Sequence, residues 1–220
     1  KQNKSDEFKI MVDDFAADGI VDKELFIDYA GYLIDNKKYE TALEYLGKIE
    51  SECKESPDFE SKMGRCLTEM GDLVRGQKYL LEASRLYYDK NPAMSIIILR
   101  YSINKRGEFN TFKLLAKILR ENEEYNEIYN VLKPARLEVE FDEELNDTLF
   151  ESELKLDLFS FVEDDYKRID DSQKNGILKV RLAEAYIGLG RFEDADAVFK
   201  DIFANKNLME THSNLIVKDF

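Results

Sequence analysis

The sequence is poor in histidine, cysteine, proline and glycine, and it has no tryptophan. One histidine and two cysteines stand among 220 residues, with three prolines and ten glycines. A single histidine excludes centres built from several histidines, and Ser-His-Asp or Cys-His chemistry would have to use that one ring, His212. So few turn-forming residues do not suit the hairpins of a β-sandwich or barrel. These shortages predict a mostly helical, non-enzymatic protein with no metal and no cofactor.

The cysteines and the apolar runs bear on the compartment. Cys53 and Cys66 are 13 residues apart, which fits neither a zinc pair nor a short redox motif. Two cysteines form no disulfide framework, so we expect an intracellular protein, cytoplasmic or nuclear. The longest apolar run is the four residues Ile96 to Leu99, far short of the roughly 20 residues of a membrane span. We therefore expect no membrane partner.

Charge is abundant and unevenly distributed. Charged residues make up 35% of the chain, and the net charge is −14. Residues 138–171 hold 14 acidic residues against Lys155, Lys167 and Arg168, whereas residues 99–120 hold six basic residues against Glu108 alone. Phosphate backbones are bound by basic surfaces. An acidic chain of this kind is therefore predicted not to bind nucleic acid directly.

Small and apolar residues recur with a period near 34 residues. In the segment 178–203, Ala183 and Ala195 flank a turn at Gly190-Arg191, and comparable turns fall at Gly71-Asp72 and Glu123-Glu124. The matching position of each second helix is occupied by Ala42, Gly76, Ile128, Val162 and Ala195, at intervals of 34, 52, 34 and 33 residues. Such periodicity is typical of stacked helix pairs.

This pattern resembles the tetratricopeptide repeat (TPR), an antiparallel pair of helices, A and B. The resemblance covers most of the chain and implies an all-α fold, a right-handed α-α superhelix in which each pair buries its apolar side against the next. Small residues at position 8 of helix A and position 20 of helix B allow the two helices to approach closely. We therefore predict that Ala42, Gly76 and Ala195 are buried at the contacts between A and B helices.

The 52-residue interval exceeds the period by 18 residues, which predicts one extra helix. The expected organisation is N-terminal repeats in residues 1–91, an inserted helix and turn in 92–108, and C-terminal repeats, one degenerate, in 109–220. The inserted helix is apolar on nearly every side, so it is predicted to be buried, with Ile97 in the core. Pro134 is predicted to kink or end its helix.

The two ends fit the same period. Residues 5–17 resemble a B helix without its A helix, and residues 207–220 resemble an A helix without its B helix. We expect the chain to be a segment of a longer array.

The resemblance implies a non-enzymatic scaffold that holds partner proteins within a multi-subunit assembly, such as a transcription or RNA-processing complex. The alternatives are a co-chaperone-type receptor for an acidic peptide, or a bacterial TPR regulatory module. Receptors of the co-chaperone kind carry a carboxylate clamp of Lys, Asn and Arg on their A helices. Here Ile27, Gly31 and Arg65 stand at clamp positions, so that clamp is missing.

The candidate groove residues are four cations, Arg65, Lys113, Lys117 and Arg120. The last three are spaced i, i+4, i+7 and therefore share one face of a helix. The resemblance places that face on the concave surface. Two interpretations stay open: the cations receive an acidic segment, from a partner or from residues 138–171 of this chain, or they form a solvated face. The expected partners are proteins or peptides, acidic ones among them, and not small-molecule substrates.

Overall fold

The computed structural model describes residues 8, 10–15 and 22–204, and 81% of these residues are helical. No strand occurs among them, which confirms the all-α class. The chain divides into two compact units, residues 1–111 and 112–220. The division falls within one helix near the predicted start of the C-terminal repeats, and each unit is described by itself below.

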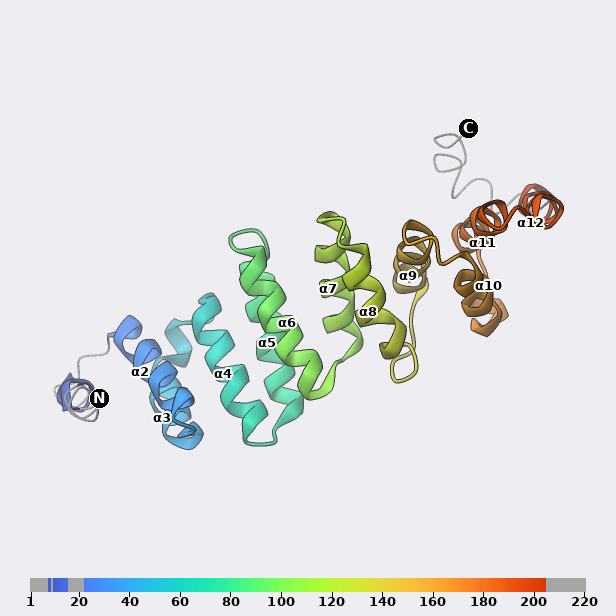
Figure 1. Ribbon diagram of the computed structural model, residues 1–220. Helices are drawn as coiled ribbons and strands as arrows, with labels where there is room; N and C mark the ends of the chain where they lie inside the picture. The colour runs from blue at the N-terminus through green and yellow to red at the C-terminus, as the bar shows by residue number, and fades with distance from the viewer. Residues whose placement is uncertain (1–7, 9, 16–21, 205–220) are drawn as a thin grey trace. The chain divides into compact units, whose positions relative to one another are not determined.

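Unit 1 is built from antiparallel helices joined by short turns (Figure 1). Its elements are α2 (Lys23–Asp35), α3 (Tyr39–Ile49), the 3-10 turn η1 (Glu50–Glu52), α4 (Pro57–Glu69), α5 (Leu73–Tyr88) and α6 (Pro92–Arg106). Side-chain caps fix several helix starts, because Asp22, Ser56 and Asp72 each accept a hydrogen bond from the backbone N–H three residues later. Helix α2 packs on α3 and α4, and α5 packs on α4 and α6.

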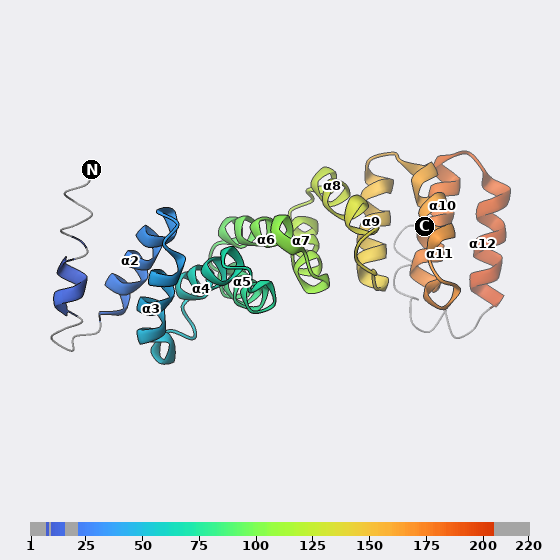
Figure 2. The same ribbon diagram turned by 90° about the horizontal axis from the view of Figure 1, so that it is seen from below.

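Unit 2 continues the same design. Its elements are the greater part of α7 (Phe109–Glu121), then α8 (Tyr125–Ala135), α9 (Glu143–Lys155), α10 (Phe159–Arg168), the 3-10 turn η2 (Asp171–Gln173), α11 (Gly176–Gly188) and α12 (Phe192–Ala204). Helix α11 packs against α9, α10 and α12 (Figure 2). Pro134 is the penultimate residue of α8, which ends at Ala135, so the predicted helix end is confirmed.

Every A–B turn has the same backbone. Each contains one residue in the left-handed region: Lys37 (φ 59°), Gly71 (φ 92°), Glu123 (φ 57°), Asp157 (φ 59°) and Gly190 (φ 72°). In all five turns the next residue donates its N–H to the carbonyl five residues earlier, at 2.8–2.9 Å, which is the Schellman pattern. Counted within the 34-residue period, all five residues occupy position 15. The five helix pairs are therefore repeats of one local structure.

Small residues lie at the contacts between the A and B helices, as predicted. Ala42 and Ala195 are buried, with 0% and 3% of their surfaces exposed, and Gly76 is buried as well. The contact is closest between α4 and α5, where a methyl carbon at Gly76 would lie 2.9 Å from the Thr68 nitrogen and 3.1 Å from the Gly64 oxygen. Only a glycine fits there, because the opposing atoms belong to the backbone.

The expected terminal helices fall partly outside the described residues. Phe8 and residues 10–15 are helical, and Val12 is fully buried. The Phe8 ring lies edge-on to Tyr29 of α2, with 5.3 Å between centroids, so this segment packs on the first repeat. The helix expected over 207–220 lies outside the described residues.

The structure corrects the expected burial of the inserted helix. Helix α6 packs on α5 through one face only, and Ile97 is 56% exposed. The buried face is made of Ser95, Ile98, Leu99 and Ser102. Ser95 donates to the Ser84 carbonyl at 2.9 Å, and Gln77 of α5 donates to the Ser102 carbonyl at 3.0 Å. The prediction for Ile97 was wrong because the contact with α5 uses Ser95, Ile98, Leu99 and Ser102, and Ile97 lies on another face of the helix.

Candidate functional site

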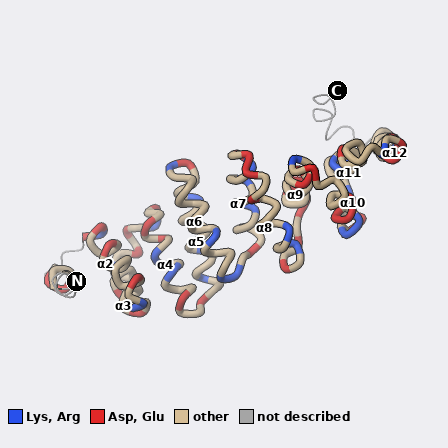
Figure 3. The backbone as a smooth tube through the Cα atoms, viewed as in Figure 1, with Lys and Arg blue, Asp and Glu red and all other residues tan. Residues whose placement is uncertain are grey.

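The cations predicted to line a groove on α7 meet acidic side chains of α9, within unit 2. Lys113 Nζ lies 2.7 Å from Asp142 Oδ2 and 2.6 Å from Glu144 Oε2. These hydrogen bonds raise the pKa of Lys113. Arg120 Nη2 lies 2.5 Å from Glu151 Oε2. The basic residues of α7 and the acidic residues of α9 are marked in Figure 3. These contacts agree with the interpretation in which the cations receive the acidic segment 138–171 of this chain.

A second arginine binds the same acids from the other side. Arg181 of α11 places Nε 2.8 Å from Asp147 Oδ1, and Arg120 of α7 places Nη2 3.2 Å from Asp147 Oδ2. The Asp147 side chain is only 7% exposed, whereas the Arg120 side chain is 35% exposed, so the network is buried at Asp147 and open to water at Arg120. Asp147 and Glu151 are four residues apart on α9 and therefore lie on one face of that helix. Both acids are already neutralised by Arg120 and Arg181.

The other two predicted groove cations differ from Lys113 and Arg120. Lys117 is exposed on the same helix, and its place in a binding groove stays a prediction. Arg65 belongs to unit 1, where its Nη2 lies 3.8 Å from Asp35 Oδ1 and its guanidinium is 6.0 Å from the Tyr101 ring centroid. Tyr101 in turn donates to Glu69 at 2.7 Å. Arg65 is therefore part of a polar contact among α2, α4 and α6.

Sequence reasoning missed a buried charge cluster between α8, α9 and α10. Lys133 Nζ lies 2.8 Å from both Glu153 Oε1 and Asp165 Oδ2, and Arg136 Nη1 lies 2.7 Å from Asp165 Oδ2. Both carboxylates are fully buried. Burial raises the pKa of Glu153, the Lys133 charge opposes that rise, and the Asp165 charge adds to it. Each ion has a partner from a neighbouring helix, so the cluster is a structural link between helices.

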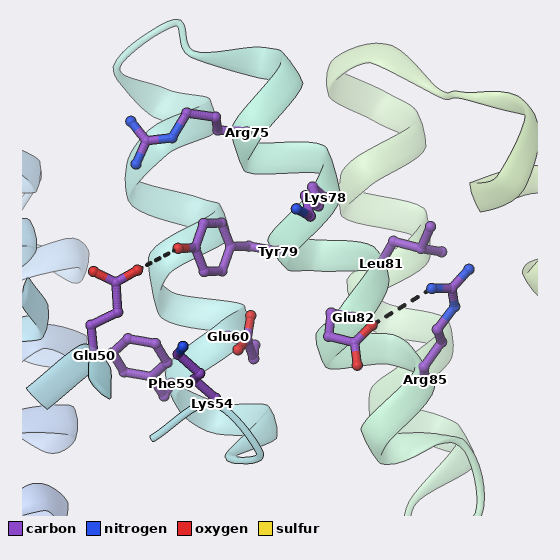
Figure 4. Close-up of a pocket in the computed structure, with 10 residues that line it drawn as sticks. All are labelled: Glu50, Lys54, Phe59, Glu60, Arg75, Lys78, Tyr79, Leu81, Glu82 and Arg85. Carbon is purple, nitrogen blue, oxygen red and sulfur yellow. Dashed lines mark hydrogen bonds and ion pairs between the residues drawn. The ribbon is translucent and has the colours of Figure 1, made fainter. Parts of the chain in front are cut away.

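Unit 1 carries a pocket of about 420 Å³ where α4 and α5 meet the end of α3 and η1 (Figure 4). The apolar and aromatic residues of its lining are Phe59, Tyr79 and Leu81. Charged side chains complete the lining: Glu50, Lys54, Glu60, Arg75, Lys78, Glu82 and Arg85. The pocket thus combines an aromatic wall with charges of both signs.

Most of these charges already have partners. Glu50 accepts a 2.8 Å hydrogen bond from the Tyr79 hydroxyl, and Arg85 pairs with Glu82 at 3.6 Å. Arg75 pairs with Asp72 at 3.5 Å. Glu60 differs: it is 7% exposed, and it forms no hydrogen bond or ion pair with any described residue. Burial, together with the nearby Glu82 and Glu50, raises the pKa of Glu60 to about 7. Glu60 is therefore a buried acid without a direct partner in a pocket, and the charge of Lys78 acts against the rise of its pKa.

A signal for Glu60 was present in the sequence. Glu60, Gly64 and Leu67 are spaced i, i+4, i+7, so the acid lies on the same stripe as residues of the α4 core. A carboxylate on such a stripe carries a desolvation cost unless it has a partner. The pocket itself could not be predicted, because its lining comes from separate elements whose packing the sequence does not state.

Neither cysteine has the environment of a reactive group. Cys53 and Cys66 are free and buried, and burial raises the pKa of both thiols, that of Cys66 to about 12. His212 lies outside the described residues. In the described part of the chain, no group of three or more His, Cys, Asp and Glu side chains could hold a metal ion. None of the helices found there is both long and apolar enough to cross a membrane.

Comparisons with known proteins give a distant similarity of fold. No family model matches the sequence, and no curated protein matches it. Two solved structures, named MamA AMB-1 C2221 and MamA AMB-1 P212121, are similar in backbone, with TM-scores of 0.40 and 0.39 and 16% sequence identity each. The similarity covers 80% of this chain and 93% and 94% of those chains. Similarity at this level is compatible with a TPR-type fold and carries no argument about function or partners.

Proposed function

We propose that this chain is a non-enzymatic interaction scaffold, a helical-repeat module that binds segments of partner proteins. The observation that carries the proposal is the fivefold recurrence of one helix–turn–helix structure, with the left-handed residue at the same position in every turn. Stacked pairs of this kind bury their apolar sides against each other and present the remaining helix faces to partners. Membership of the TPR family, and a place in a transcription or RNA-processing assembly, are parts of this proposal.

The alternative of a receptor for an acidic peptide is less well supported in unit 2. Its cations Lys113 and Arg120 already contact acids of α9, at 2.5–2.7 Å. An acidic peptide would have to displace these carboxylates, which are tethered to the same unit and are therefore present at high effective concentration. Lys117, the third cation predicted on that helix, is exposed.

The test is selection of peptides from a random display library on the immobilised chain, followed by calorimetric titration of the enriched sequences. We expect enriched peptides to bind the folded chain with a defined stoichiometry. The matched control is the same chain unfolded in urea, which exposes apolar surface without the repeat faces. Enrichment of the same peptides on both forms, or of none on the folded form, would contradict the proposal. Loss of acidic peptides alone in Lys117→Glu would instead favour the acidic-peptide receptor.

A further inference from the structure

The pocket of unit 1 contains a buried acid without a direct partner. Of the charged residues that line the pocket, only Glu60 is buried, and none of the described residues forms an ion pair or hydrogen bond with it. Lys54 and Lys78 also lack ion pairs among the described residues, but both are exposed and therefore hydrated. A hydrated lysine gains little from a ligand, whereas a desolvated carboxylate gains much from a cation. A bound cation would therefore stabilise the pocket more than a bound anion would.

The apolar lining of the pocket could accommodate an aliphatic chain that carries a cation at its end. Tyr79 and Leu81 offer apolar surface in the pocket, and the Tyr79 ring can also face a cation. Phe59 is fully buried and offers none. The Tyr79 hydroxyl is held by Glu50 at 2.8 Å, which fixes that ring in place (Figure 4). The net charge of the chain, −14, favours approach of a basic segment.

We infer that this pocket binds a basic side chain, arginine or lysine, of a partner segment, with Glu60 as the residue that receives its charge. The inference rests on the proposed function and adds the chemistry of the partner. The stem packs on Tyr79 and Leu81, and the charged end reaches the Glu60 carboxylate. Lys78 is exposed, and its charge acts on Glu60 without an ion pair between them.

Binding is then expected to depend on pH. Glu60 must lose its proton before it attracts a cation, and its pKa is raised to about 7 by burial and by Glu82 and Glu50, against the opposing charge of Lys78. The other titratable or charged groups lining the pocket are Lys54, Arg75, Tyr79 and Arg85. Affinity should rise about tenfold between pH 6 and pH 8, as the ionised fraction of a group with a pKa near 7 does.

The experiment uses small probes on the full chain. The carboxyl carbon of Glu60 is followed by ¹³C NMR while n-butylguanidinium, n-butylammonium, butyramide or butyrate is added. We expect the two cations to lower the pKa of Glu60 and to saturate, and the neutral and anionic probes to have no such effect. The two cationic probes distinguish arginine-like from lysine-like ligands.

Two variants make the result decisive. Glu60→Gln keeps the shape of the side chain without its charge and should abolish the response of backbone amides around the pocket to either cation. Glu55→Gln, at an exposed position, is the matched control and should leave it unchanged. An equal response in Glu60→Gln, or preferential binding of butyrate, would overturn the inference. Peptides from the display selection that still bind Glu60→Gln would leave the scaffold function standing while this pocket fails.

Discussion

Each turn between an A helix and a B helix depends on a single residue with a left-handed backbone. All five turns require a left-handed backbone, yet glycine stands in only two of them, at Gly71 and Gly190. Lys37, Glu123 and Asp157 adopt the same conformation with a side chain. Side chains other than those of Asn and Asp are disfavoured there, since Cβ crowds the following carbonyl oxygen. These turns therefore store strain that glycine would relieve.

Glu123→Gly and Lys37→Gly are expected to stabilise the protein by about 0.5–1 kcal/mol each, because relief of the left-handed strain outweighs the extra chain entropy of glycine. Urea unfolding followed by circular dichroism measures the change. The control is Glu124→Gly at the next position, where φ is −82° and glycine brings only its entropic cost. Equal destabilisation by Glu123→Gly and Glu124→Gly would show that the turn is not strained.

Gly76→Ala is expected to destabilise unit 1 by about 1–3 kcal/mol, in the range of overpacked core sites. The added methyl group meets the Thr68 nitrogen and the Gly64 oxygen, which belong to the backbone of α4 and cannot move alone. Gly47→Ala is the matched control: it lies in α3 with no atom within 4 Å of the added carbon. It should stabilise by about 0.5–1 kcal/mol through helix propensity. Thermal or urea unfolding compares the two, and similar effects would contradict the close contact of α4 and α5.

Helix α6 does not have the single apolar face of an ordinary amphipathic helix. Its apolar residues point in most directions, and its contact face includes Ser95 and Ser102. Their small side chains allow a close approach to α5, and their hydroxyls bond to Ser84 and Gln77 there. Ile98 and Leu99 fill the rest of the contact, with 5% and 0% of their surfaces exposed.

Ile98→Ala is therefore expected to cost about 2–5 kcal/mol, as buried large-to-small changes do. Ile97→Ala, next to it in the same helix, should change the stability by less than about 0.5 kcal/mol, because Ile97 is 56% exposed. Urea unfolding of both variants measures the difference. A larger cost for Ile97→Ala would mean that α6 turns its other face to a neighbour.

Among the described residues, each of the two units contains a buried glutamate whose pKa is raised. Glu60 belongs to unit 1 and Glu153 to unit 2. A glutamate whose pKa is raised on folding keeps its proton longer in the folded state than in the unfolded state. Its contribution to stability is therefore greatest at low pH and is lost as the pH rises toward the folded pKa.

Glu60→Gln isolates this effect. The folded pKa of Glu60 is about 7 against an ordinary value of 4.5, so the wild type should lose about 2 kcal/mol relative to the variant between pH 5.5 and pH 8. Urea unfolding at a series of pH values measures the gap, and Glu55→Gln at an exposed position serves as control. Parallel curves for wild type and Glu60→Gln would show that the carboxylate is compensated.

The helical class, the helix pairs and the small residues between them could be predicted from the amino-acid sequence, since the 34-residue period and the turn positions are local properties of the chain. The sequence also predicted a helix where α6 lies and a helix end near Pro134. Which face of α6 is buried depended on the partner helix, because an apolar residue is buried only where another element covers it. The structure likewise decided that Lys113 and Arg120 bind acids of α9, and that Glu60 lines a pocket without a partner. Ion pairs and pockets join residues about 20 to 35 positions apart, and their distances follow from how helices stack rather than from periodicity.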